Sequence, residues 1–111
     1  MRIPKKLKIA GKVYDVEITD KLYLGAAICS AEIMYADLLI RVHPAAKGKM
    51  EADFLHEVVH GIADAMGYRD HDEREIDAMA QMLHQVIQDN PEMFLPDEDE
   101  GEADEQGNDQ K

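Results

Sequence analysis

The residues His56-Glu57-Val58-Val59-His60 carry two histidines four positions apart, with a glutamate directly after the first. On an α-helix, positions i and i+4 lie one turn apart on the same face, so both imidazoles can reach one metal ion. Glu57 is turned by about 100° from His56, where it cannot ligate the same ion but can contact a water on it. The segment therefore predicts a zinc site with His56 and His60 as ligands and Glu57 as general base.

The chemistry of such a site is well defined. Zinc bound by three protein ligands lowers the pKa of a bound water to about 7 and polarises a carbonyl, and a neighbouring carboxylate then accepts the proton of the water. The reaction that this pattern favours is hydrolysis of a peptide bond. A different interpretation is a helix whose two histidines are partly buried, hydrogen-bond to the backbone and bind nothing. The flanking side chains favour the metal, because they make the helix apolar on nearly every side, where two imidazoles and a carboxylate are costly to bury.

A third ligand must come from outside this helix. One class of H-E-x-x-H enzymes continues as H-x-x-G-x-x-H, but Ala63 and Met66 occupy the positions of that glycine and last histidine. In the following segment "DEREIDAMAQML", Glu73 and Asp77 lie one helical turn apart, and both could face the first helix. His71, in the short linker between them, is expected to be exposed or near the cleft rather than a ligand.

The first half of the chain has the two-residue period of β-strands. Residues 2 to 18 alternate apolar and polar side chains around Ala10-Gly11-Lys12, which predicts a β-hairpin. Two more strands are expected, one around residues 28 to 34 and one at 38 to 42, joined by a turn at Tyr35-Ala36-Asp37. We therefore expect three or four short antiparallel strands before any helix.

The period becomes helical from Met50, and Gly67 is a typical C-terminal stop. A second helix is predicted from Asp72, its N-cap, to Asp89. The fold class is therefore α+β, with a three- to four-stranded antiparallel sheet followed by the H-E-x-x-H helix and a second helix packed against it. The second helix is expected to bury one apolar stripe, formed by Ile76, Met79, Ala80, Leu83, Val86 and Ile87.

The combination of H-E-x-x-H with Glu73-Arg74-Glu75-Ile76-Asp77 on the next helix resembles the gluzincin type of metallopeptidase. This resemblance implies that His56, His60 and Glu73 hold zinc, that Glu57 is the general base, and that Asp77 supports a ligand histidine. Residues 1 to 95 as a whole look like short phage and prophage proteins distantly related to the ImmA/IrrE metallopeptidases. These proteins share the early hairpin, the "HEVVH" helix and a second helix ending in a phrase like "LHQVIQDNP".

The expected function is therefore that of a zinc-dependent metallopeptidase, phage or mobile-element encoded, which acts on a protein or peptide substrate. The alternative is a zinc-stabilised interaction protein of the same minimal zincin-like fold that cleaves nothing. Zincin-like architecture also implies that residues 38 to 42 could pair with an extended peptide, if that strand forms the edge of the sheet over the cleft.

Composition limits the other possibilities. A chain of 111 residues is expected to form one domain, here residues 1 to 95. Residues 96 to 111 hold eight acidic residues and one lysine, a net −7 of the total −12, and are predicted to be a disordered acidic tail. This charge argues against a nucleic-acid partner. The single cysteine cannot form an internal disulfide, and no N-terminal apolar stretch suits a signal peptide or membrane span, so we expect a cytoplasmic protein without a membrane partner.

Overall fold

The computed structural model describes residues 1–97, and the predicted acidic tail lies outside the described residues from position 98 onward. The predicted α+β class is confirmed, because the strands come first and the helices follow. The elements of the described part are β1 (Lys6–Ile9), β2 (Lys12–Ile18), β3 (Ala31–Met34), β4 (Leu39–Val42), α1 (Lys47–Ala65), α2 (Glu73–Asp89) and the 3-10 helix η1 (Pro91–Phe94).

The four strands form one mixed sheet in the order β1-β2-β4-β3. The β1–β2 and β3–β4 pairs are antiparallel, as expected, but β2 and β4 are parallel. The segment after β2 carries the chain to the far edge of the sheet, and β4 returns between β3 and β2. Because β4 is paired on both sides, the expectation that residues 38 to 42 could form an edge is wrong, and β3 is the edge strand on this side.

The β1–β2 hairpin closes through the two residues Ala10 and Gly11, as its sequence predicted. Both have positive φ, 51° for Ala10 and 86° for Gly11. Two consecutive residues with positive φ are the signature of the type I′ turn, whose twist matches that of the flanking strands. This turn fixes the register in which Leu7 pairs with Tyr14.

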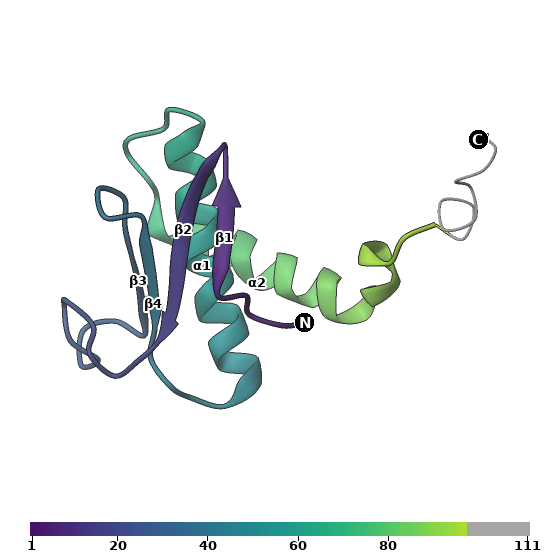
Figure 1. The fold of residues 1–111 in the computed structure, drawn as a ribbon, viewed down its shortest axis with the longest axis horizontal. Helices are drawn as coiled ribbons and strands as arrows, with labels where there is room; N and C mark the ends of the chain where they lie inside the picture. Colours follow the sequence, from purple (N-terminus) through teal and green to yellow (C-terminus); the bar gives the residue numbers. More distant parts are fainter. Residues whose placement is uncertain (98–111) are drawn as a thin grey trace.

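Helix α1 lies across one face of the sheet, and the core fills the space between the two layers (Figure 1). Ile40 and Val42 of the sheet are fully buried, and Phe54 packs against them from the helix. Gly61 is the point of closest approach, since a Cβ built there would lie 2.8 Å from the Cδ1 atom of Ile9. The glycine after the second histidine therefore lets α1 lie close to the strands.

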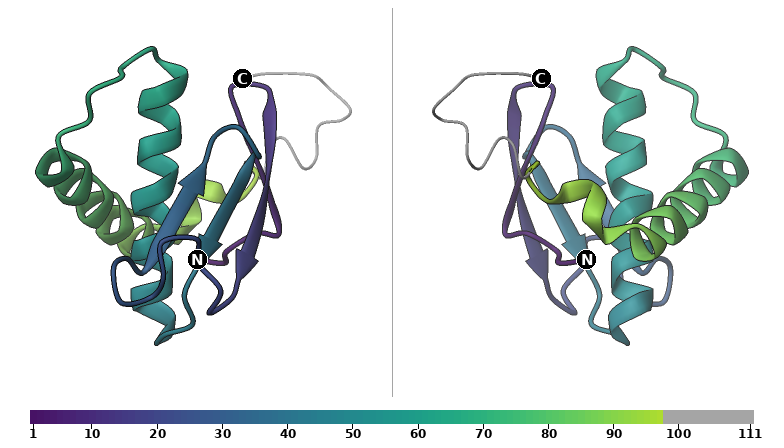
Figure 2. Two further views of the ribbon diagram at one scale, coloured as in Figure 1. Left: turned by 90° about the vertical axis from the view of Figure 1, so that its left-hand side faces the viewer. Right: turned by 90° about the vertical axis from the view of Figure 1, so that its right-hand side faces the viewer.

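Helix α2 packs against α1 and η1 and not against the sheet, and it leaves α1 at a steep crossing (Figures 1 and 2). Ile76 and Ala80 are buried as predicted. Met79 and Val86, however, are 61% and 41% exposed, so the prediction that they belong to the buried stripe is wrong. Within residues 1–97, α2 meets α1 and η1, and the apolar side chains on its other faces have no packing partner.

Neither helix in residues 1–97 combines the length and apolar character needed to cross a membrane.

Candidate metal centre

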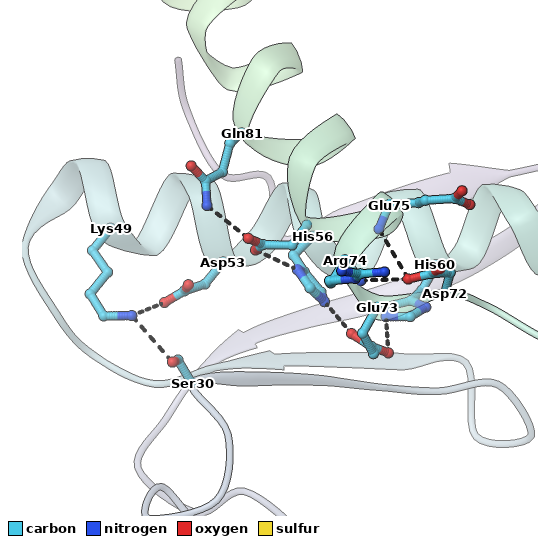
Figure 3. Close-up of polar contacts among 11 residues, drawn as sticks. Ser30, Lys49, Asp53, His56, His60, Asp72, Glu73, Arg74, Glu75 and Gln81 are labelled. Carbon is cyan, nitrogen blue, oxygen red and sulfur yellow. Dashed lines mark hydrogen bonds and ion pairs between the residues drawn. The ribbon is translucent and has the colours of Figure 1, made fainter.

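Two helices meet at the site and each supplies part of it. The i, i+4 spacing on α1 points the imidazoles of His56 and His60 toward the start of α2. The side chain of Asp72 caps α2 by accepting hydrogen bonds from the backbone N–H groups of Arg74 and Glu75, at 2.9 and 3.4 Å. This cap, which the sequence predicted, places Glu73 in the first turn, where its carboxylate lies between the two histidines (Figure 3).

The ligand atoms of these residues converge. Nε2 of His56 is 3.1 Å from Oε1 of Glu73, and Nε2 of His60 is 3.0 Å from Oε2 of the same carboxylate. One ligand atom from each of the three residues lies within 4.8 Å of the other two. The three residues that were predicted as ligands are thus brought together, and the His56-His60-Glu73 cluster could hold a metal ion.

The rear nitrogen of His56 is held by the fourth predicted residue. Nδ1 of His56 lies 3.3 Å from Oδ1 of Asp77, and Gln81 donates to Oδ2 of the same carboxylate at 2.8 Å. A carboxylate can only accept, so the contact with Asp77 favours the tautomer that carries its hydrogen on Nδ1. That neutral tautomer has on Nε2 the lone pair that a metal ion would need.

The rear nitrogen of His60 is held by His71, which the sequence did not assign to the site. Nε2 of His71 donates to the backbone carbonyl of Tyr68 at 2.8 Å, because a carbonyl oxygen can only accept. Nδ1 of a neutral His71 is then an acceptor, and it lies 2.7 Å from Nδ1 of His60. His60 therefore donates through Nδ1 and also presents the lone pair of Nε2 forward. The only signal in the sequence was that His71 lies two positions before Glu73, and the path of the linker decides where its ring points.

The environment of His60 favours the neutral ring. Burial lowers its pKa, with help from His56 and His71, although Glu73 acts in the opposite direction. A neutral imidazole is the form that binds metal. With both rings neutral, two nitrogen lone pairs face the two oxygens of one carboxylate, an electron-rich set that a cation would satisfy. The donor chemistry of these residues fits a metal ion.

Glu57, the predicted general base, is only 8% exposed, and no hydrogen bond or ion pair joins its side chain to another residue in the described part of the chain. It lines a cavity of about 230 Å³ beside the cluster, together with Cys29, Ser30, Ala31, Asp53, His56 and Asp77. Burial raises the pKa of Glu57 to about 7; His56 opposes this shift, and Glu73, Asp53 and Glu32 add to it. A carboxyl group with a pKa near neutrality can both accept and release a proton there.

The electrostatic field around the cavity is negative. Burial raises the pKa of the Cys29 thiol, and the charges of Glu32 and Glu57 raise it further. Burial also raises the pKa of Tyr35 to about 12, with added effects first from Asp64 and then from Glu57 and Glu73. Such a field attracts cations.

A lysine bridges the rim of this cavity. Lys49 donates to Asp53 at 2.9 Å and to the hydroxyl of Ser30 at 3.2 Å (Figure 3). Both partners line the cavity, so the bridge ties α1 to the segment that leads into β3. Asp53 lies one turn before His56 and, like His71, was not recognised as part of the site from its spacing.

No protein-family model, no curated protein and no solved structure matches this chain.

Proposed function

We propose that the chain is a zinc-dependent metallopeptidase in which His56, His60 and Glu73 hold the ion. Two imidazole nitrogens and one carboxylate are a donor set of catalytic zinc sites that keep a fourth position open. These three residues would hold the ion from both helices, since one ligand atom from each lies within 4.8 Å of the other two.

The observation that carries the proposal is the buried Glu57 carboxyl group, which has no protein partner among residues 1–97 and lines the cavity beside the cluster. Zinc in this position supplies polarisation of the scissile carbonyl and a lowered pKa for the attacking water. Glu57 accepts the proton of that water and can pass it to the departing amine, a double role for which a pKa of about 7 is suited. Asp77 and His71 keep the two imidazoles oriented.

The peptide is proposed to bind along β3. This strand is the sheet edge next to the cavity, and its first residue, Ala31, lines the cavity. In residues 1–97 the strand pairs with β4 alone, so its outer side can pair with an extended chain, and such pairing suits a peptide because it does not depend on the peptide's side chains.

A second candidate is a zinc-stabilised interaction protein that cleaves nothing. It is favoured by the way α2 is attached, because among the elements of residues 1–97 α2 packs on α1 and η1 alone, and it buries just Ile76 and Ala80 of its own residues. A metal bridging α1 and α2 would contribute to stability in such a thin fold.

Substitution of Glu57 separates the two candidates. Zinc-loaded wild type and Glu57→Gln are incubated with a library of unstructured peptides, and new termini are identified by mass spectrometry. The peptidase proposal predicts cleavage by the wild type and a loss of at least about 100-fold in Glu57→Gln, with zinc affinity retained, because a general base is removed without a ligand. His60→Ala is the control that loses both. Zinc binding without any cleavage by the wild type would leave the interaction protein as the function.

A further inference from the structure

An apolar groove lies between the C-terminal half of α1 and the N-terminal half of α2, on a different set of residues from the cavity beside Glu57. It encloses about 360 Å³, within the range of roughly 300–1,000 Å³ typical of binding pockets. We call it the interhelical groove and define its apolar lining by Val59, Ile62, Met66, Tyr68, Ile76 and Met79.

The lining of this groove is unusually exposed for apolar side chains. Met66 and Met79 are 62% and 61% exposed, and Ile62 from the middle of α1 is 42% exposed. Scattered single exposures need no explanation, but these residues border one groove, which is the pattern of an interaction site. Methionine adapts its shape to a partner and is common on such surfaces.

The charges around the groove indicate its partner. Asp70, Asp72 and Glu75 border it, and no lysine or arginine is among its lining residues. Between residues 50 and 97 the chain has two basic side chains of the Lys or Arg type, Arg69 and Arg74, and neither lines the groove. Arg69, in the linker, pairs with Asp64 at 3.8 Å. The groove is therefore apolar at its floor and acidic at its rim.

Two occupants from within the protein have the wrong chemistry. Residues 98 to 111 contain no Leu, Ile, Val, Met, Phe or Tyr that could fill the groove, and they repeat its negative charge. A second copy has the same acidic rim and a net charge of −12 of its own, so it is repelled. A partner with apolar and basic side chains is complementary to both the floor and the rim.

We propose that the interhelical groove binds a basic amphipathic helix of a partner protein. The lining residues of α1 lie at positions 59, 62 and 66, and those of α2 at 76 and 79, so each wall presents a helical row. A third helix with apolar anchors at i, i+3, i+4 and i+7 packs between such rows, while its lysines reach the acidic rim.

The test uses two peptides of about 18 residues, made only of leucine and lysine in the same proportions. In one, the leucines form a single helical face, and in the other they are spread evenly around the helix. Binding to the full-length protein is measured by fluorescence anisotropy at near-physiological ionic strength, with EDTA present. The proposal is thus tested without the metal, and its failure is separate from any failure of the peptidase function.

We expect the amphipathic peptide to bind at least about tenfold more tightly than the evenly spread one, because only its leucines can enter the groove together. Met66→Lys and Met79→Lys should each weaken binding by about tenfold or more, since they place a charge among the anchors. Val13→Lys is the matched control, because Val13 is 44% exposed on the β1–β2 hairpin, away from the groove, and should change binding by less than about twofold.

Circular dichroism verifies that each variant is folded. Equal binding of the two peptides, or equal losses in Val13→Lys and Met79→Lys, would show general attraction to an acidic protein and overturn the proposal. A dimer in sedimentation equilibrium that Met79→Lys dissociates would also overturn it, because the occupant would then be a second copy.

Discussion

Helices α1 and α2 are joined by histidine–carboxylate contacts in two places, and these two places of contact differ in kind. At the candidate metal centre, α1 supplies the histidines and α2 supplies Glu73 and Asp77. Farther along, α1 supplies Glu51 and α2 supplies His84, whose Nε2 donates to Oε1 of Glu51 at 2.9 Å. Lys47 donates to the other oxygen of Glu51 at 2.6 Å.

The two places differ in whether the buried acceptor atoms receive hydrogen bonds from side-chain donors. Glu51 is only 2% exposed, yet each of its oxygens receives a hydrogen bond from a side chain, so its burial is compensated. At the metal centre, the forward nitrogens of two histidines face a carboxylate, and the neighbouring Glu57 is buried without a protein partner among residues 1–97. The same residue types thus form a structural tie where they are satisfied, and a site for a ligand where they are not.

The largest expected effect is on zinc affinity, which should fall on substitution at the metal centre and not at the Glu51–His84 contact. Glu73→Ala and His60→Ala should each weaken zinc binding on the order of 1,000-fold, because each removes one of three protein ligands. Glu51→Gln removes the centre of the other contact and should change zinc affinity by less than about twofold. Competition with a fluorescent chelator measures all three. A loss in Glu51→Gln as large as that in Glu73→Ala would mean that the two contacts are not distinct.

The stability of the metal-free protein should depend more on Glu51 than on His60, the opposite of what is expected for zinc affinity. In the metal-free protein at pH 7, Glu51→Gln should lower the free energy of unfolding by about 1–3 kcal/mol, because the amide has no charge and keeps only one acceptor oxygen for Lys47 and His84. His60→Ala should change it by less than about 1 kcal/mol, since the metal centre is not internally satisfied. Urea unfolding with EDTA present gives both values. If His60→Ala destabilised the protein more than Glu51→Gln, the Glu51–His84 contact would not be the structural tie, and this assignment would be contradicted.

The groups behind the ligand histidines should have intermediate effects. Asp77→Ala and His71→Ala should each weaken zinc binding by about tenfold or somewhat more, because the ligand ring loses the partner that orients it. His71→Asn should recover part of the loss, since its amide oxygen can accept from Nδ1 of His60. In the metal-free protein, imidazole ¹⁵N shifts report the tautomer of His60. An unchanged tautomer in His71→Ala would contradict the orienting role of His71.

The smallest effect concerns acid stability. Burial alone would raise the pKa of Glu51, but the hydrogen bonds from Lys47 and His84 outweigh it and hold this pKa below the ordinary value of 4.5. A carboxylate with a lowered pKa stabilises the fold fully above its unfolded-state pKa, and this contribution is lost as the pH falls through its folded-state pKa. The stability gap between wild type and Glu51→Gln should therefore close on acidification below pH 4.5. Thermal unfolding at a series of pH values measures it, and a gap that widens instead would contradict the assigned shift.

Local patterns in the sequence predicted the parts of the site that depend on one element. The i, i+4 histidines, the Asp72 cap and the hairpin turn follow from short-range rules, and the structure contains all three. The parallel pairing of β2 with β4 was not predicted, because alternation reports which face a residue occupies and not which strand lies beside it. His71 was expected to be exposed or near the cleft, but its contact with His60 was not predicted, because the linker has no periodicity that could place its ring.

The exposure of Met79 and Val86 in the apolar stripe of α2 was not predicted, for a different reason. Its helical spacing indicates an apolar face but cannot tell whether another layer covers that face. Met79 and Val86 are exposed because α2 packs on α1 and η1 and not on the sheet. The prediction treated the stripe as core, whereas part of it forms the interhelical groove.

The most direct test of the central claim is the metal content of the purified wild type, Glu73→Ala and Glu51→Gln proteins, measured by inductively coupled plasma mass spectrometry. The proposal predicts about one zinc ion per chain in the wild type and in Glu51→Gln, and much less in Glu73→Ala. A folded wild-type protein that takes up no metal, even when zinc is supplied in excess, would contradict the claim that His56, His60 and Glu73 form a metal centre.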